Sequence, residues 1–127
     1  MSKITVERIK RRGGSLMTYY CVFNMTKEEF SFGTDGDTQF SARQMTTQSR
    51  LEYLSQHWKE PKQIEPLKNG EMVYVNLEKD GINKMFVWTM ASGGELFSDI
   101  IDVSPGKSYS IKTKTGLMSL KLLVSES

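Results

Sequence analysis

The chain has 127 residues, 38% of them hydrophobic and 25% charged, with a formal net charge of +2. This length fits one globular domain, because two domains of half that size would each lack a sufficient hydrophobic core. The small net charge does not by itself indicate a nucleic-acid-binding protein, and the single cysteine excludes an intrachain disulfide or a zinc site built from cysteines.

The N-terminal part of the chain predicts three strands. KITVER (3–8) is rich in β-branched residues, and SLMTYYCVFNM (15–25) alternates between two faces. KEEFSF (27–32) follows as the third predicted strand, and the turn residues GTDGD come directly after it. A Gly-Gly pair separates the first two strands and predicts a turn between them.

At the end of the first predicted strand, the alternating pattern places a charged residue on the inward side. With Ile4 and Val6 inward, alternation also places Arg8 inward, where an apolar core would not accept it. We therefore expect this strand to end or bulge near Arg8, with an exposed hairpin tip after it. In the next strand, Tyr19 is expected to point inward and Tyr20 outward.

One later segment has helical instead of alternating spacing. Leu51, Leu54 and Trp58 stand at i, i+3 and i+7, and a proline follows three residues later. We expect one α-helix around residues 42–58, inside an insertion at about 33–63 that lies across one end or face of the sheet.

Strand signals resume after this insertion. Asn69-Gly70 is a hairpin signal, and turn residues recur about every 8–12 residues through positions 69–116. The whole chain, 1–127, is expected to form a single all-β domain, a mainly antiparallel β-sandwich of about seven to nine strands with the inserted helix. The expected core residues are Ile4, Val6, Tyr19, Cys21, Phe23, Leu51, Leu54, Met72, Tyr74, Phe86, Trp88, Ile100, Val103, Ile111, Leu120 and Leu122.

Three stretches together resemble a known pattern. ITVERIKRRGGSLMTYYCVFN, LKNGEMVYVNLEKDG and DIIDVSPGKSYSIK are similar to small bacterial β-sandwich domains of the PEGA-like group and its uncharacterised relatives, through turn glycines and strand alternation over about residues 4–24 and 64–112. The resemblance implies a β-sandwich and supplies no catalytic residues. The chain departs from the pattern where about 40 residues, including the predicted helix, replace a short hairpin.

The residues that could serve in catalysis or metal binding stand singly in the sequence and match no complete motif. His57 is the one histidine, so any catalytic histidine must be this one, and Cys21 lies in mid-strand, where a buried thiol behaves as a small hydrophobe. Asp35 and Asp37 suggest a calcium loop, but the frame counted from Asp35 has neither the glycine nor the glutamate that an EF-hand needs. We therefore predict no catalytic residues, no metal site and no cofactor.

Basic residues gather in both ends of the chain. Residues 1–14 hold five basic residues and one acid, and residues 105–121 hold four lysines and no acid. If these two ends are neighbours in space, they could form one basic face. The candidate polyanion-binding residues are Arg8, Lys10, Arg11 and Arg12, with the tyrosines of the next strand nearby.

The first predicted function is a non-enzymatic binding or interaction module, with a protein partner or with a second copy bound through a sheet edge. The alternative is a binder of single-stranded nucleic acid or another polyanion that uses the N-terminal basic cluster. Two further possibilities stay open. Tyr53, Trp58, Tyr74 and Trp88 could form a sugar-binding platform, and a deep polar pocket around His57 would favour a small hydrolase or ligand-binding enzyme.

The predicted location is the cytoplasm. Neither the N-terminal segment MSKITVERIKRR nor any later stretch has the long apolar run of a signal peptide or a membrane span. We therefore expect no membrane partner.

Overall fold

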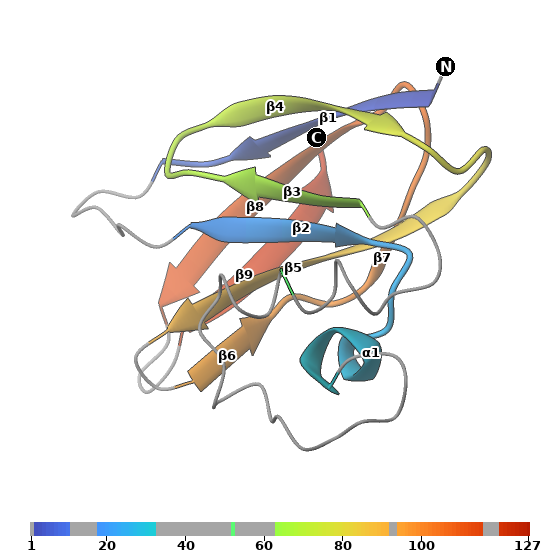
Figure 1. The fold of residues 1–127 in the computed structure, drawn as a ribbon. Coiled ribbons are helices and arrows are strands. Elements are labelled where there is room, and N and C mark those ends of the chain that lie inside the picture. Colours follow the sequence, from blue (N-terminus) through green and yellow to red (C-terminus); the bar gives the residue numbers. More distant parts are fainter. Residues whose placement is uncertain (1, 11–17, 33–51, 53–62, 92–93, 116–119) are drawn as a thin grey trace.

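The computed structural model of the chain describes residues 2–10, 18–32, 52, 63–91, 94–115 and 120–127. Within these ranges it contains nine strands and one short helix (Figure 1). The elements in chain order are β1 (Ser2–Arg8), β2 (Tyr19–Phe23), α1 (Lys27–Phe32), β3 (Gln63–Leu67), β4 (Met72–Leu77), β5 (Asn83–Ala91), β6 (Gly94–Phe97), β7 (Ile101–Val103), β8 (Ser108–Thr115) and β9 (Leu120–Glu126).

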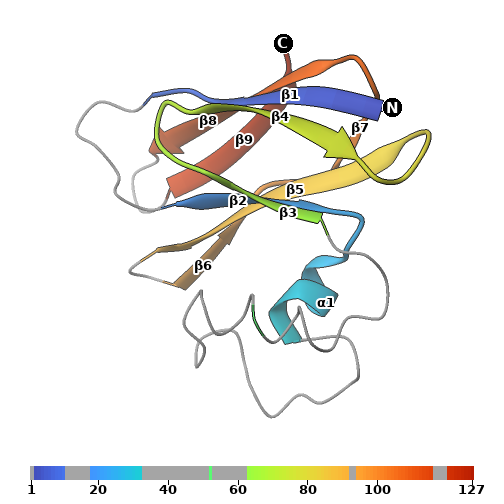
Figure 2. The ribbon, with the colours of Figure 1, turned by 45° about the horizontal axis from the view of Figure 1, so that its top comes forward.

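The strands form two sheets packed face to face, and α1 lies on the outer side of one of them (Figure 2). Sheet A has the order β4-β1-β8-β9, and sheet B has the order β3-β2-β5-β6 with β7 also paired to β5. Every pairing is antiparallel except that of β1 with β8, which is parallel. The predicted mainly antiparallel β-sandwich is therefore confirmed.

The main hydrophobic core lies between the two sheets, because alternate residues of their strands point toward each other. The buried residues of this core are Ile4, Val6, Tyr19, Cys21, Phe23, Leu67, Val75, Leu77, Met85, Val87, Val103, Tyr109, Ile111 and Leu122. The predicted core positions in β1, β2, β7, β8 and β9 are confirmed wherever the structure describes their side chains. Leu51, Leu54 and the side chain of Leu120 lie outside the described part.

The prediction that Met72 and Tyr74 of β4 point into the core is wrong. Met72 is 50% exposed and Tyr74 is 62% exposed, whereas Val75 and Leu77 are buried. Both faces of MVYVNL carry apolar residues, so alternation alone fits either orientation. The pairing with β1 decides it, because Val75 lies opposite the inward Ile4. The predicted core residue Ile100, just before β7, is also exposed, by 42%.

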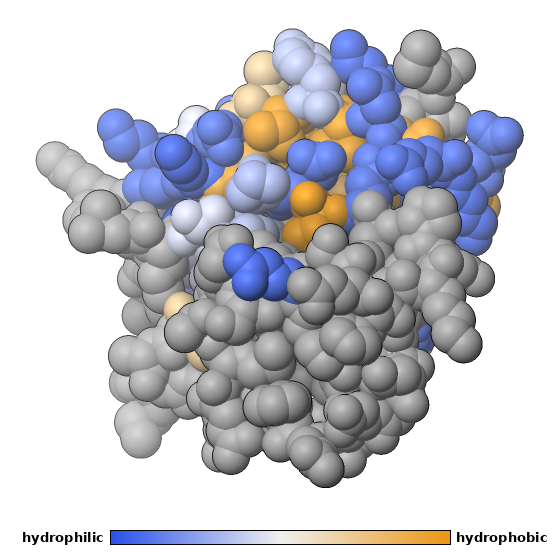
Figure 3. Space-filling model, in the orientation of Figure 1, coloured by the Kyte–Doolittle hydropathy of each residue, from blue (hydrophilic) through white to orange (hydrophobic). Residues whose placement is uncertain are grey.

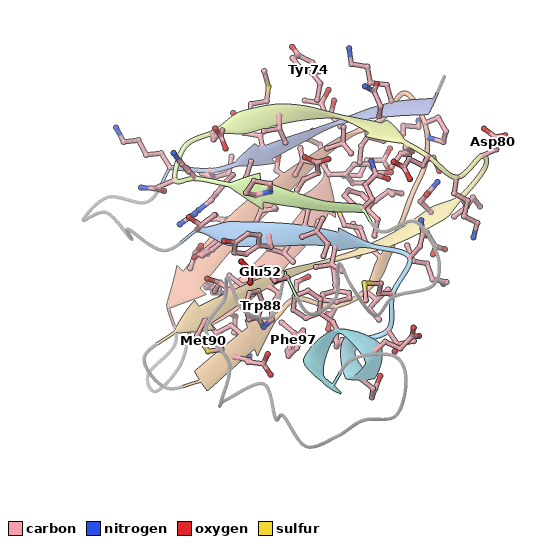
Figure 4. The ribbon with its side chains drawn as sticks, in the orientation of Figure 1. Glu52, Tyr74, Asp80, Trp88, Met90 and Phe97 are labelled. Atoms are coloured by element: carbon pink, nitrogen blue, oxygen red, sulfur yellow. The ribbon has the colours of Figure 1, made fainter. Side chains whose placement is uncertain are left out.

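Sheet B is apolar on both faces. Phe86 and Trp88 are buried as predicted, but they point away from sheet A and form a second cluster with Phe30 of α1. The ring centroids of Phe30 and Trp88 are 5.0 Å apart. Figure 4 shows Trp88 and Phe97 on the side of sheet B that carries α1. Since Trp88 is fully buried, it cannot serve in a sugar-binding platform.

The KEEFSF segment is a helix, so its prediction as a strand is wrong. The hydroxyl of Thr26 accepts a hydrogen bond of 3.0 Å from the backbone N–H of Glu29, which caps the first turn. Two acids in that turn, Glu28 and Glu29, favour the positive end of the helix dipole. Of the separate helix predicted around 42–58, the structure describes only Glu52, which is helical.

Candidate functional site

Arg8, the first residue of the predicted polyanion-binding cluster, is part of the core. β1 ends at Arg8 as expected, but its side chain points inward and is only 1% exposed. Nη1 donates a hydrogen bond of 2.9 Å to the backbone oxygen of Leu67, and the guanidinium carbon lies 3.4 Å from the ring centroid of Tyr19. Burial lowers the pKa of the Arg8 guanidinium, and Tyr19 opposes that shift. Arg8 therefore cannot grip a polyanion.

Both tyrosines of β2 already make contacts within the protein. Tyr19 is buried, as predicted, and its hydroxyl shares a 2.8 Å hydrogen bond with the hydroxyl of Thr113 in β8. Tyr20 points to the opposite face, where it is half-buried with its ring centroid 5.7 Å from that of Trp88. The buried Tyr19 ring therefore cannot stack on a nucleic-acid base, and the Tyr20 ring is partly covered.

The rest of the predicted N-terminal cluster is described only at Lys10. Lys10 is exposed and lies beside the β3–β4 turn, since a Cβ placed on Gly70 would sit 3.4 Å from its Cβ. Arg11 and Arg12 lie outside the described residues. Of the four candidate residues, one is therefore buried, one is exposed and two are not described.

The two basic ends of the chain nevertheless become neighbours. β1 pairs with β8, and β8 pairs with β9, so both ends contribute to sheet A. Lys3 of β1, Lys112 and Lys114 of β8 and Lys121 of β9 are exposed and alternate with buried core residues. They therefore share the outer face of sheet A, the face turned away from sheet B. The condition that the two basic ends are neighbours in space is thus met for these strands.

The lysines at the β8–β9 end of this face have like-charged neighbours. Lys114 lies directly opposite Lys121 in the antiparallel register, and Lys112 is two residues along the same face. Among the described residues, the ion pairs within 4.0 Å are Lys84–Asp102 and Lys107–Glu126, so none of these three lysines joins an acid. Like charges directly opposite each other destabilise a strand pair. We name Lys112, Lys114 and Lys121 the lysine triad.

Acidic residues are few in sheet A. Its four strands contain two acids, Glu7 and Glu126, and Glu126 has its carboxylate 3.7 Å from the amino group of Lys107. Glu7 is exposed and shares the outer face with the lysines, since it alternates with the buried Val6 and Arg8. The outer face therefore carries a positive charge that the described acids balance only in part.

Tyr74 adds an exposed ring to the same face. It lies opposite Thr5 in the β1–β4 register, and the amino group of Lys3 is 4.7 Å from its ring centroid. Figure 4 shows Tyr74 pointing away from the body of the molecule, and Figure 3 shows hydrophobic residues among hydrophilic ones on the surface over β3 and β4. With Met72 and Leu123 also exposed, by 50% and 43%, the outer face offers apolar contacts beside its lysines.

A separate open pocket of about 330 Å³ lies where the β4–β5 turn approaches α1 and β7. Asn24 shapes one wall: with φ at 60°, its amide donates to Asn83 and its side-chain oxygen accepts from the backbone N–H of Lys84. The lining residues are Asn24, Met25, Thr26, Glu29, Lys79, Ile82, Lys84, Ile100 and Asp102. This lining contains no histidine or cysteine, and His57 lies outside the described residues.

Cys21 is not available as a nucleophile. It is fully buried between the sheets, and burial, with a smaller contribution from the charge of Glu65, raises the pKa of its thiol to about 12. A thiol with this pKa stays protonated at neutral pH, and the thiolate is the reactive form.

In the described ranges, no three His, Cys, Asp or Glu side chains come together as a metal site, and no helix is long and apolar enough to cross a membrane. The chain matched no protein-family model, no curated protein and no solved structure. The resemblance to PEGA-like domains therefore stays a prediction.

Proposed function

We propose that the protein is a non-enzymatic binding module that recognises a polyanion through the outer face of sheet A. The observation that carries the proposal is the lysine triad, in which Lys114 and Lys121 stand directly opposite each other without a described acid beside them. A ligand with closely spaced anionic groups would offset this repulsion and release its own counterions on binding.

Three of the sheet edges, β3, β4 and β9, give less support to self-association, which the first predicted function included as one possibility. β3, an edge of sheet B, contains Pro66, which has no N–H to offer a partner strand. The side-chain amide of Gln63 donates a hydrogen bond to the backbone oxygen of Asn76, and its side-chain oxygen accepts one from the backbone N–H of Glu78. These two bonds use backbone groups along the edge formed by β4, so a partner strand has fewer of them to pair with. β9, the other edge of sheet A, lies against β6.

Titration of the whole protein with inorganic polyphosphate and with heparin, at several salt concentrations, tests the proposal. We expect binding at low salt that weakens steeply as salt rises, because counterion release drives the association. The double variant Lys114→Gln/Lys121→Gln should bind both polyanions more weakly. The matched control Lys68→Gln/Lys79→Gln removes two exposed lysines from turns outside sheet A and should bind like the unchanged protein.

Two results would contradict the proposal. One is the absence of binding to both polyanions at low salt. The other is an equal loss of affinity in the two double variants, which would show that overall charge, and not the lysine triad, determines binding. Sedimentation of the free protein at several concentrations measures self-association in the same samples.

A further inference from the structure

We infer that the polyanion is single-stranded nucleic acid, with Tyr74 stacking on a base while the lysine triad binds the backbone. This inference rests on the proposed function and names the ligand class of the same face. Its basis is the combination, on one surface of a sheet, of an exposed aromatic ring with lysines that form no ion pair with a described acid.

Tyr74 has the exposure that stacking requires. Tyr74 is 62% exposed as a residue even though Lys3 lies over its ring, whereas Tyr19, Tyr109 and Trp88 are buried. A base has a π-face that can cover this ring, and such stacking tolerates any sequence. Lys3, 4.7 Å from the ring centroid, is placed to meet the phosphate next to a stacked base.

The register gives a path from Tyr74 to the lysine triad. Tyr74 lies opposite Thr5, and Thr5 lies beside Ser108 of β8. Lys112 is four residues further along β8 on the same face, so ordinary strand spacing puts it about 16 Å from Tyr74. Ser108 and Ser110 stand between them with hydroxyl groups that can donate hydrogen bonds to phosphate oxygens. A strand of several nucleotides spans this distance.

A duplex fits this arrangement less well than a single strand. In a duplex the base faces are stacked within the helix, so a ring on a flat sheet cannot reach them without unstacking base pairs. A single strand exposes its base faces and bends to follow a surface. Polyphosphate and heparin have no bases, so they can engage the lysines but not Tyr74.

The experiment compares three labelled ligands by fluorescence anisotropy: a 12-nucleotide oligo-dT, a 12-nucleotide strand with the same phosphates but abasic sugars, and a 12-base-pair duplex. We expect oligo-dT to bind about ten-fold more tightly than the abasic strand, the factor that one stacked base supplies. Tyr74→Leu should lower the affinity for oligo-dT to that for the abasic strand and leave abasic binding unchanged.

The lysine variant gives a different signature. Lys114→Gln/Lys121→Gln should weaken both single strands alike and reduce the salt slope for oligo-dT by about 1.4, since each lost phosphate contact removes about 0.7. Thermal unfolding of both variants checks that the fold is kept, which we expect because all three side chains are exposed.

The outcomes separate the two proposals. Equal affinity for oligo-dT and the abasic strand, tighter binding of the duplex, or an oligo-dT affinity unaffected by Tyr74→Leu would overturn the nucleic-acid inference. Polyphosphate binding that depends on the lysine triad would still support the proposed function in those cases. Absence of binding to polyphosphate, heparin and every oligonucleotide would overturn both.

Discussion

At the scale of single residues, Arg8 shows how a buried charge can belong to a core. A guanidinium removed from water is costly unless its charge and its N–H groups find partners. Tyr19 supplies a ring face at 3.4 Å from the guanidinium carbon, and the Leu67 carbonyl accepts a 2.9 Å hydrogen bond. Because Arg8 lies in sheet A and its partners lie in sheet B, the contact joins the two sheets.

We predict that Arg8→Met lowers the free energy of unfolding by about 2 kcal/mol, because the buried carbonyl of Leu67 loses the hydrogen bond that Arg8 donates. Urea denaturation measures this change. Lys10→Met, an exposed position two residues later, is the control and should change stability little. A variant as stable as the unchanged protein would mean that the cost of burying the guanidinium cancels its contacts.

At the scale of elements, α1 depends on its surroundings. Six residues are too few for a helix to be stable alone in water. Thr26 caps its N-terminus, and Phe30 packs on Trp88 and Phe86 of β5. The helix therefore exists because its cap and its buried ring fix it to the outer face of sheet B.

We predict that Thr26→Ala destabilises the protein by about 1 kcal/mol, the usual cost of losing an N-cap side chain. Thr26→Ser keeps the hydroxyl and should retain most of the stability. Chemical denaturation of the three proteins checks this expectation. Equal stability of the alanine and serine variants would contradict the role of the cap.

The two misread elements have local causes. In KEEFSF the spacing of two phenylalanines imitates a strand, while the capping pattern Thr26 to Glu29 predicts a helix start. In β4 both faces are apolar, and only pairing with β1 selects Val75 over Tyr74 for the core. Alternation therefore could not predict that Tyr74 is exposed, because it fits either orientation of β4. Lys112 and Lys114 stand two residues apart in a predicted strand, so the sequence does predict that they share one face of the sheet.

At the scale of the whole molecule, polar groups lie where the edges of the two sheets approach at β3 and β4. Glu65 stands opposite Cys21 in the β2–β3 register. Partial burial, and secondarily the charge of Glu78, raise the pKa of the Glu65 carboxyl above its ordinary value. The folded protein therefore holds this proton more tightly than the unfolded chain does.

The raised pKa of Glu65 makes the free energy of unfolding depend on pH. The contribution of Glu65 to stability is fully present below the ordinary glutamate pKa, about 4.3, and is lost as pH rises through the raised pKa. We predict that Glu65→Gln is more stable than the unchanged protein at pH 7 and that the difference disappears near pH 4. Urea midpoints at the two pH values test this, and a difference independent of pH would contradict it.

The pairing of distant segments explains what the sequence could and could not predict at this scale. Short strands and turns indicated a sandwich, because alternation and turn residues act locally. The alignment of Thr5 with Ser108, about a hundred positions apart, depends on the assembled sheets. Only this pairing shows that the two basic ends meet, and therefore where the lysine triad stands relative to Lys3 and Tyr74.

The parallel pairing of β1 with β8 also has a consequence for synthesis. β1 precedes β8 along the chain and is therefore synthesised before it, and β1 occupies the middle of sheet A between β4 and β8. Its partner β8 is translated more than a hundred residues later. The edge of β1 that pairs with β8 therefore has no partner strand until β8 is made, and the dominance of such distant contacts predicts folding in milliseconds to seconds, as in other β-sandwiches.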